Sequence, residues 1–206
     1  MATNTTPREV SRGDRWSLYF FATVGTITAA WSIIAAIWRI IEVLPNHSVE
    51  VLASFRGTPA SAPIGPDGTP ATVQLQEAVI TVPSLPVASL WSIVIQQVLM
   101  AATVVTIVTC LILLIANLVR SRVFSRTNTR LVGATGLIAV LGYAAYPFFG
   151  NMAANGAFAR LSEGTFENVV ISVDLTTLFA LGFAAALAST VFLVGERLQR
   201  DTEGLV

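Results

Sequence analysis

One uncharged run constrains the fold of this chain more than any other feature, because no charged residue occurs between Glu77 and Arg120. A helix that crosses a membrane needs about 20 apolar residues, and this run is long enough to supply them. It ends at a basic cluster formed by Arg120, Arg122, Arg126 and Arg130. Since basic residues collect on the cytoplasmic side of membrane segments, the run predicts a spanning helix over residues 88–119 that enters the cytoplasm at Arg120.

Three other apolar segments complete a predicted four-helix bundle, at residues 17–41, 131–158 and 175–194. Only 12% of the chain is charged, whereas a typical soluble domain has about 25% charged residues. The alternative for residues 17–41 is a cleavable signal peptide, but the apolar part of such a peptide is only about 7 to 15 residues long. We therefore expect an all-α membrane protein, a single membrane domain over residues 1–206 with a four-helix transmembrane bundle.

The distribution of charge predicts how the four helices are threaded. Residues 1–15 and 120–130 carry more basic than acidic side chains, whereas residues 42–86 hold four acidic side chains and one arginine. The predicted cytoplasmic parts are residues 1–15, 120–130 and 195–206, and the predicted extracytoplasmic loops are residues 42–86 and 160–173. This multi-pass arrangement places both termini in the cytoplasm.

The outer loops are expected to form a small β-containing cap. Prolines and glycines recur through residues 42–86 and disfavour a helix there. Apolar and polar residues alternate near residues 48–54 and 73–82, which predicts two strands joined by a loop over residues 59–70. A similar alternation near residues 168–173 predicts a third short strand that joins the first two.

The length of the second helix predicts where its polar residues lie. Residues 87–119 as one helix would extend roughly 50 Å, whereas the hydrocarbon core of a bilayer is about 30 Å thick. The outer part of this helix is therefore expected to project beyond the membrane. Gln96 and Gln97 would lie near the boundary, hydrogen-bonded to a neighbouring helix or to the outer loop.

A candidate pocket follows from these glutamines and from polar residues in the outer half of the third span. Its members are Gln96, Gln97, Tyr143, Tyr146, Asn151 and Asn155. The alternative is that the tyrosines and asparagines belong to an interfacial belt and to helix packing. Closer to the cytoplasm, glycines such as Gly136 and Gly142 permit close helix contact, as does the small-residue pair Ala185 and Ser189.

Charged residues at the helix ends carry further predictions. Arg39 lies in the last turn of the first span, where its long side chain can reach outward; the alternative is a functional arginine within the membrane. Ser125 or Asn128 is expected to cap the third helix, and the fourth helix is expected to run on to about residue 203. Opposite charges predict that the arginines of residues 120–130 lie near three acidic side chains of the tail: Glu196, Asp201 and Glu203.

The chain lacks the sets of residues from which catalytic and metal sites are built. His47 is its only histidine and Cys110 its only cysteine, and no carboxylate falls within a predicted span. The sequence therefore predicts no catalytic residue, no metal site, no cofactor and no enzymatic activity, and it argues against an ion-coupled transporter. The net charge is zero, which argues against direct nucleic-acid binding.

Three local segments resemble a known family. Residues 123–131 contain Phe124, Ser125 and Asn128, residues 82–86 combine a short apolar strand with proline, and the tail reads Phe192-x-x-Gly195-x-x-Leu198-x-x-Asp201-x-x-Gly204-Leu205-Val206. In these segments the chain resembles the bacterial family called domain of unknown function 2975. The resemblance implies a four-helix protein of the bacterial inner membrane. Members often lie beside a gene for a small helix-turn-helix regulator, which implies a regulatory pairing, and no catalytic residue carries over because the family has no assigned activity.

Two functional hypotheses follow. The first is a non-enzymatic membrane protein with a sensing or partner-regulating role, with the outer cap as input and the cytoplasmic loop and tail as output. The alternative is a small transporter or channel subunit with a pocket at the outer ends of the second and third helices. The expected partners are the lipid bilayer and a cytoplasmic regulatory protein. The sequence leaves open whether the chain also forms a homo-oligomer.

Overall fold

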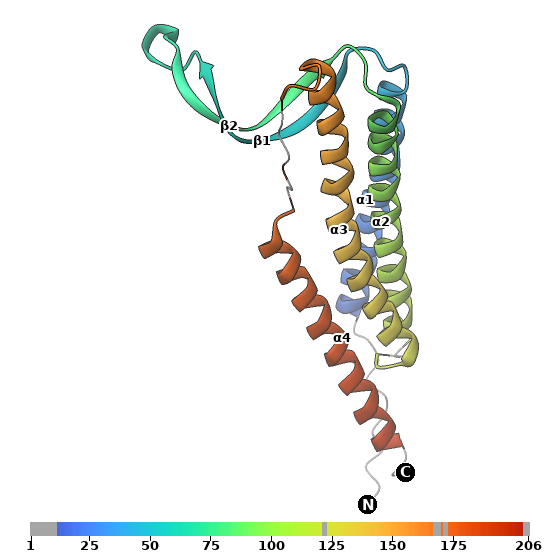
Figure 1. Ribbon diagram of the computed structural model, residues 1–206. Coiled ribbons are helices and arrows are strands. Elements are labelled where there is room, and N and C mark those ends of the chain that lie inside the picture. The colour runs from blue at the N-terminus through green and yellow to red at the C-terminus, as the bar shows by residue number, and fades with distance from the viewer. Residues whose placement is uncertain (1–11, 121–122, 167–169, 171–172, 204–206) are drawn as a thin grey trace, which may run out of the picture. The chain divides into compact units, whose positions relative to one another are not determined.

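The computed structural model describes residues 12–120, 123–166, 170 and 173–203 (Figure 1). Within these residues the chain forms four long helices and one antiparallel hairpin. The helices are α1 (Arg12–Val43), α2 (Val87–Val119), α3 (Arg126–Leu161) and α4 (Leu175–Glu203). The strands are β1 (Val49–Ala62) and β2 (Ala71–Val82), and the short helix η1 (Pro66–Gly68) lies in the turn between them.

All four helices are long and apolar enough to cross a membrane, so the predicted helical architecture is confirmed at that level. Their surfaces are compatible with a multi-pass membrane protein. Trp31 is 70% exposed, and Phe179 and Phe183 are each 73% exposed, a pattern that would be costly for a protein surrounded by water. The helix α4 ends at Glu203, which confirms that the fourth helix continues past its apolar part.

The chain divides into two compact units. The first, here the helical unit, comprises the described parts of Met1–Ala35, Met100–Tyr143 and Leu175–Val206. The second, here the hairpin unit, comprises the described parts of Ala36–Leu99 and Ala144–Asp174. Both units draw residues from α1, α2 and α3, while the hairpin belongs to the second and the described part of α4 to the first.

Close approach of α3 to α4 holds part of the helical unit together. A Cβ atom added to Gly136 would lie 2.5 Å from the Cβ of Ala185, so the glycine lets the two helices meet. At Gly142 the side chain of Thr103 from α2 occupies the space that a side chain at position 142 would fill. Packing between small residues is the usual way in which helices associate in lipid, and the predicted glycine contacts are confirmed at these two positions.

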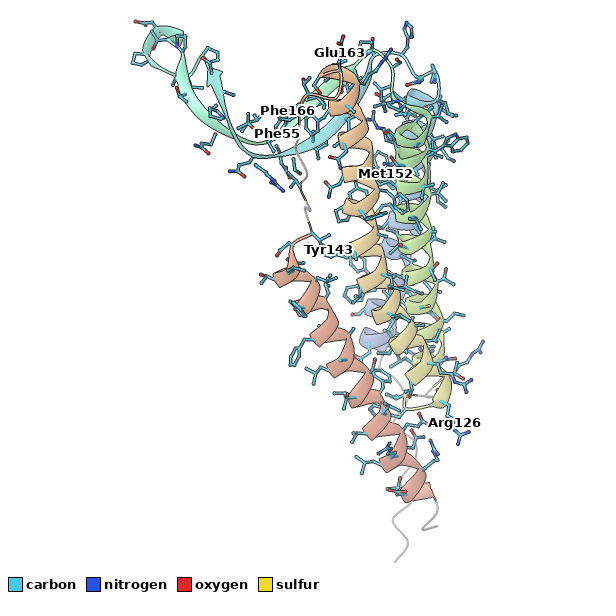
Figure 2. The ribbon with its side chains drawn as sticks, viewed as in Figure 1. Phe55, Arg126, Tyr143, Met152, Glu163 and Phe166 are labelled. Carbon is cyan, nitrogen blue, oxygen red and sulfur yellow. The ribbon has the colours of Figure 1, made fainter. Side chains whose placement is uncertain are left out.

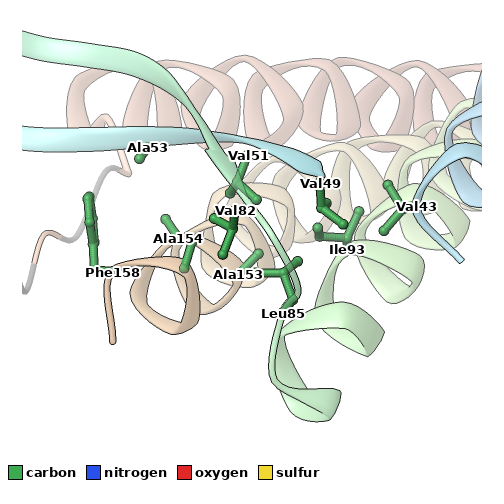
Figure 3. Packing of buried hydrophobic residues seen from close by; sticks show 11 residues of the cluster. Val43, Val49, Val51, Ala53, Val82, Leu85, Ile93, Ala153, Ala154 and Phe158 are labelled. Carbon is green, nitrogen blue, oxygen red and sulfur yellow. The ribbon is translucent and has the colours of Figure 1, made fainter. Parts of the chain in front are cut away.

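The hairpin unit has a core made by the base of the hairpin and three helices (Figure 3). Val49, Val51 and Ala53 of β1 are buried, while the intervening Glu50 and Leu52 are exposed, as expected for a strand with one covered face. The residues that cover this face come from α1, α2 and α3 and from the segment before α2: Val43, Leu85, Ile93, Ala153, Ala154, Ala157 and Phe158.

The two strands are longer than predicted. They pair from Val49 opposite Val82 to Ala62 opposite Ala71, with an irregularity between Ser54 and Thr58. The predicted loop over residues 59–70 is therefore wrong at its start, because Pro59 lies within β1. A proline is tolerated there because both strands of a two-stranded sheet are edge strands. In an edge strand, some backbone N–H groups form no hydrogen bond to another strand, so the missing N–H of proline costs little. The predicted third strand near residues 168–173 falls mostly outside the residues that the structure describes.

Candidate ligand-binding site

A cavity of about 290 Å³ opens in the hairpin unit between the base of the hairpin and the helices. Three charged side chains contribute to its wall, Arg39 from α1, Glu50 from β1 and Glu77 from β2. The helices α2 and α3 add polar and apolar groups, and β1 adds the rest. These further lining residues are Val51, Leu52, Ser54, Ile93, Gln96, Gln97, Tyr146, Pro147, Gly150, Asn151 and Ala153.

The amide of Gln96 is held in place against α3. Its Nε2 donates a hydrogen bond of 2.9 Å to the carbonyl oxygen of Tyr146. A Cβ atom on Gly150 would lie 2.7 Å from that nitrogen, so the absence of a side chain at Gly150 makes room for the glutamine. The predicted hydrogen bond from this pair of glutamines to a neighbouring helix is therefore confirmed for Gln96, and Gln97 lines the same cavity.

Arg39 connects α1 to the hairpin. Its Nη1 lies 2.8 Å from Oε2 of Glu42, and its Nη2 donates to the backbone carbonyl of Glu50. The Arg39 side chain is 28% exposed. The arginine thus ends in a cavity wall, and its positive charge is offset by Glu42 on the next turn of α1.

The two glutamates of the cavity lie on neighbouring strands. Glu50 pairs across the sheet with Thr81, and Glu77 pairs with Ser54. Both side chains are exposed, and within the described residues neither forms an ion pair with an arginine of the cavity. With Arg39 already paired to Glu42, the cavity carries an excess of negative charge.

Hydrogen-bonding groups and carboxylates together can hold a small polar molecule that carries positive charge. The amides of Gln96, Gln97 and Asn151 supply donors and acceptors, and the apolar lining excludes part of the water. Within the part of the chain that the structure describes, no group of three or more histidine, cysteine, aspartate or glutamate residues is placed to hold a metal ion.

The structure brings together four of the six residues of the predicted pocket. Gln96, Gln97, Tyr146 and Asn151 line the cavity. Tyr143 belongs to the helical unit and does not line the cavity. The side chain of Asn155 is exposed and also does not contribute to the cavity.

Sequence reasoning missed the charged half of the cavity. Arg39, Glu50 and Glu77 come from three different elements, α1, β1 and β2, and no regular spacing along one helix or strand connects them. One available signal was the alternation in β1, which places Glu50 and Leu52 on the face opposite the buried Val49 and Val51. A second signal was Arg39, a charged residue near the end of an apolar helix. Such a residue needs a polar partner, but the sequence does not identify which residue that partner is.

An aromatic cluster ties the segment after α3 to the hairpin, and it too was not predicted. The rings of Phe55 and Phe158 are 5.2 Å apart between centroids, as are those of Phe158 and Phe166, and Phe55 and Phe166 are 6.4 Å apart. Figure 2 shows Phe55 and Phe166 near one another. The Phe55–Phe158 pair is edge-to-face and the other two pairs are tilted; an edge-to-face pair contributes about 0.5–1.5 kcal/mol beyond burial.

The basic cluster of the helical unit is organised around Glu196. Arg126 approaches Oε1 of this glutamate to 3.6 Å with its Nε, and Arg200 forms a second ion pair with the same oxygen. Thr129 donates a hydrogen bond of 2.8 Å to Oε2. The predicted proximity of the cytoplasmic arginines to the tail is confirmed for Arg126 and Glu196.

The other members of the predicted cluster do not join this arrangement. Arg120 and Arg130 are exposed, and within the described residues they form no ion pair with Asp201. Arg122 and the side chain of Glu203 fall outside the residues that the structure describes. The cap of α3 is as predicted for Ser125, whose Oγ accepts a hydrogen bond of 3.3 Å from the backbone nitrogen of Asn128.

Glu196 is almost completely buried, 7% exposed, and lies beyond the apolar segment that ends at Val194. The hydrogen bond from Thr129 is the largest influence on its ionisation and lowers the pKa of the carboxyl group. The hydrogen bond from Arg200 and the positive charges of Arg200 and Arg126 lower this pKa further, while burial acts in the opposite direction. Glu196 is therefore kept ionised by its neighbours.

Comparison with known proteins adds no assignment to these sites. No protein-family model, no curated protein and no solved structure matches the chain. The resemblance to the domain of unknown function 2975 family therefore stays a prediction, and the cavity and the charged cluster described above are the features from which we infer a function.

Proposed function

We propose that this chain is a non-enzymatic sensor of the bacterial inner membrane, which binds a small organic cation in the cavity of its hairpin unit and regulates a cytoplasmic partner. The observation that carries the proposal is the pair of carboxylates, Glu50 and Glu77, in a cavity that also holds three side-chain amides. In the proposed topology this cavity faces the outside, and both termini and residues 120–130 face the cytoplasm.

The charge of the cavity supports the choice of ligand class. Arg39 is the cation in the wall, and its ion pair with Glu42 and its bond to the Glu50 carbonyl occupy both terminal nitrogens. Glu50 and Glu77 are then available to an ammonium group, which prefers carboxylate oxygens as acceptors. An anionic ligand would meet two like charges in the same cavity.

The first experiment measures binding of putrescine to the detergent-solubilised protein by isothermal titration calorimetry. Succinate, which has the same number of carbon atoms and the opposite charge, is the matched ligand control. We expect putrescine to bind and succinate not to bind. Replacing Glu50→Gln or Glu77→Gln should weaken putrescine binding by about tenfold, because each change removes a charged acceptor.

The variant control is Glu163→Gln, an exposed glutamate of the same unit that does not line the cavity. It should bind putrescine as tightly as the unchanged protein. Equal binding of succinate, or equal loss in Glu50→Gln and Glu163→Gln, would refute the proposed ligand class.

The regulatory part of the proposal concerns the tail. Removal of the residues after Val194 should abolish interaction with the cytoplasmic partner while leaving putrescine binding intact, because the cavity contains no residue of the tail. The measurement is a pull-down from native membrane with the intact and the shortened chain. If the intact and the shortened chain bind the same partners, the regulatory role is contradicted, whereas the assignment of the ligand is unaffected.

A small transporter or channel subunit is the second candidate. The observation that favours it is that polar side chains of two predicted spanning helices, Gln96 and Asn151, face one cavity. Proteoliposomes that contain the protein and accumulate radiolabelled putrescine would support transport, whereas binding without accumulation supports a sensor.

A further inference from the structure

An apolar groove of about 650 Å³ runs along α4 in the helical unit. Its volume falls within the range of about 300–1,000 Å³ that is typical of ligand sites. Its wall is almost entirely apolar, with Phe124 on one side and α4 on the other. The α4 residues that line it are Thr190, Val191, Val194, Gly195, Leu198, Gln199 and Thr202.

Phe124 fixes one wall of this groove. Its ring lies directly over Gly195, so that a side chain at position 195 would collide with the ring. The ring also packs against Phe192, with 5.7 Å between the centroids. The groove is therefore shaped by a packed aromatic side chain and by the absence of a side chain at Gly195.

A second, polar pocket of about 230 Å³ adjoins the groove and shares Phe124 and Gln199 with it. Its other lining residues are Ser125, Arg126, Glu196 and Arg200. The side chains of Arg126 and Arg200 are 74% and 53% exposed, whereas that of Glu196 is 9% exposed. Two largely exposed arginine side chains thus pair with one buried carboxylate, so the pocket carries a net positive charge.

The groove crosses the end of the apolar part of α4. That part ends at Val194, while the groove extends from Thr190 to Thr202, about 18 Å along a helix. If α4 crosses the membrane as its composition predicts, the apolar end of the groove faces the hydrocarbon and the polar pocket faces the headgroup region. An occupant must then be apolar at one end and anionic at the other.

We infer that the groove and the adjoining pocket form a binding site for one anionic phospholipid of the cytoplasmic leaflet. An acyl chain lies along Phe124, Val191 and Leu198, and the phosphate accepts hydrogen bonds from Arg126 and Arg200. The ion pairs with Glu196 use Nε of Arg126 and Nη2 of Arg200, so each guanidinium keeps other nitrogens for a phosphate. This site is independent of the proposed cation-binding cavity, with which it shares no residue.

The test is native mass spectrometry of the full chain, solubilised in detergent and supplied with dioleoylphosphatidylglycerol or with dioleoylphosphatidylcholine. The two lipids have the same acyl chains and differ in the charge of the headgroup. We expect preferential retention of one phosphatidylglycerol molecule. Arg126→Gln and Arg200→Gln should each lower that retention by about fivefold, and Arg197→Gln, an exposed arginine of the same helix outside both pockets, should leave it unchanged.

The apolar half has its own pair of variants. Leu198→Trp places a bulky side chain in the groove and should reduce retention of both lipids, whereas Leu187→Trp, at an exposed position of α4 outside the groove, should not. Equal retention of the two lipids by the unchanged protein would overturn the proposal. An equal loss in Arg197→Gln would also overturn it, because the effect would then be one of general charge.

Other occupants give different results in the same spectra. Displacement of the lipid by an excess of inorganic phosphate would assign the pocket to a free anion and overturn the lipid assignment. A dimer that Leu198→Trp converts to a monomer with unchanged lipid retention would assign the groove to a second copy of the chain. Should Arg200→Gln fail to fold, Arg126→Gln decides, because Arg126 is largely exposed and its contact with Glu196 is the longer one.

Discussion

Glu196 is a buried carboxylate whose partners come from two helices. Thr129 and Arg126 are residues of α3, and Arg200 lies one turn further along α4. A charge in such a position requires partners, because an unpaired buried carboxylate is strongly unfavourable. The glutamate therefore joins α3 to α4 by contacts that depend on its ionised form.

The lowered pKa of Glu196 gives the stability of the protein a defined dependence on pH. A carboxyl group whose folded pKa lies below its usual value of 4.5 stabilises the fold above that value, and the stabilisation is lost as the pH falls through the folded pKa. We expect the Tm, followed by tryptophan fluorescence in detergent, to fall more steeply below pH 4.5 in the unchanged protein than in Glu196→Gln.

At pH 7 the same variant should have the lower Tm, because it has lost the ionised partner of Arg126 and Arg200. The two melting curves should converge in acid. Glu163→Gln, which changes an exposed glutamate, should follow the unchanged protein at every pH. Melting temperatures of Glu196→Gln and the unchanged protein that differ by a constant amount would contradict this account.

At the scale of the elements, the approach of α3 to α4 depends on a missing side chain. Gly136→Ala would place a Cβ atom 2.5 Å from the Cβ of Ala185, and relief of the overlap requires the helices to separate. We expect a loss of about 1–3 kcal/mol in the free energy of unfolding. Thermal or chemical denaturation in detergent measures it.

The matched control for this prediction is Gly182→Ala on α4, where an added Cβ meets no atom within 4 Å. That change should leave stability equal or raise it by up to about 1 kcal/mol, since alanine favours a helix over glycine. Adding Ala185→Gly to Gly136→Ala should restore part of the loss. Equal effects of the two glycine substitutions would show that backbone entropy, and not helix contact, governs position 136.

The hairpin is held at its base by contacts that strand pairing alone would not provide. A two-stranded hairpin by itself is marginally stable in water. Here Asn46 donates to the carbonyl oxygen of Leu85 at 3.0 Å and accepts from its nitrogen at 2.7 Å, which joins the two ends of the hairpin. Val49, Val51 and Val82 are buried beside it, so the base of the hairpin is part of a core and can position Glu50 and Glu77.

At the scale of the whole molecule, the proposed threading assigns sides of the membrane to parts of the chain. It can be tested with single cysteines in a Cys110→Ser background. Asp67→Cys, in the turn of the hairpin, should react with a membrane-impermeant maleimide in intact cells. Thr202→Cys, near the end of α4, should react only after the cells are permeabilised.

These two positions are both exposed, so a difference between them reports the side of the membrane and not burial. The unsubstituted Cys110→Ser chain, which has no cysteine, sets the background of the labelling. Labelling of Thr202→Cys in intact cells would contradict the cytoplasmic placement of the C-terminal segment. Labelling of neither position in intact cells would contradict the outer placement of the hairpin.

The sequence by itself determined the helical architecture of this protein. Uncharged segments such as residues 88–119 predict membrane helices because a backbone in lipid must satisfy its own hydrogen bonds, and a helix does so locally. The start of β1 followed from the alternation of apolar and polar residues, because a strand with one covered face has a period of two. The sequence did not determine where β1 ends. Pro59 was assigned to the loop, although a proline that is excluded from a central strand is compatible with an edge strand.

Only the tertiary structure decided which of the predicted polar contacts form and which further residues join them. It grouped Gln96 and Asn151 with Arg39, Glu50 and Glu77 and left out Tyr143 and Asn155. Of the predicted contacts between the cytoplasmic arginines and the acidic side chains of the tail, it kept that of Arg126 with Glu196 and left Asp201 outside the cluster. The physical reason is that composition and periodicity report the average environment of a segment, whereas a site depends on contacts between residues that are distant in the sequence and on the few ångströms that a glycine such as Gly150 leaves open.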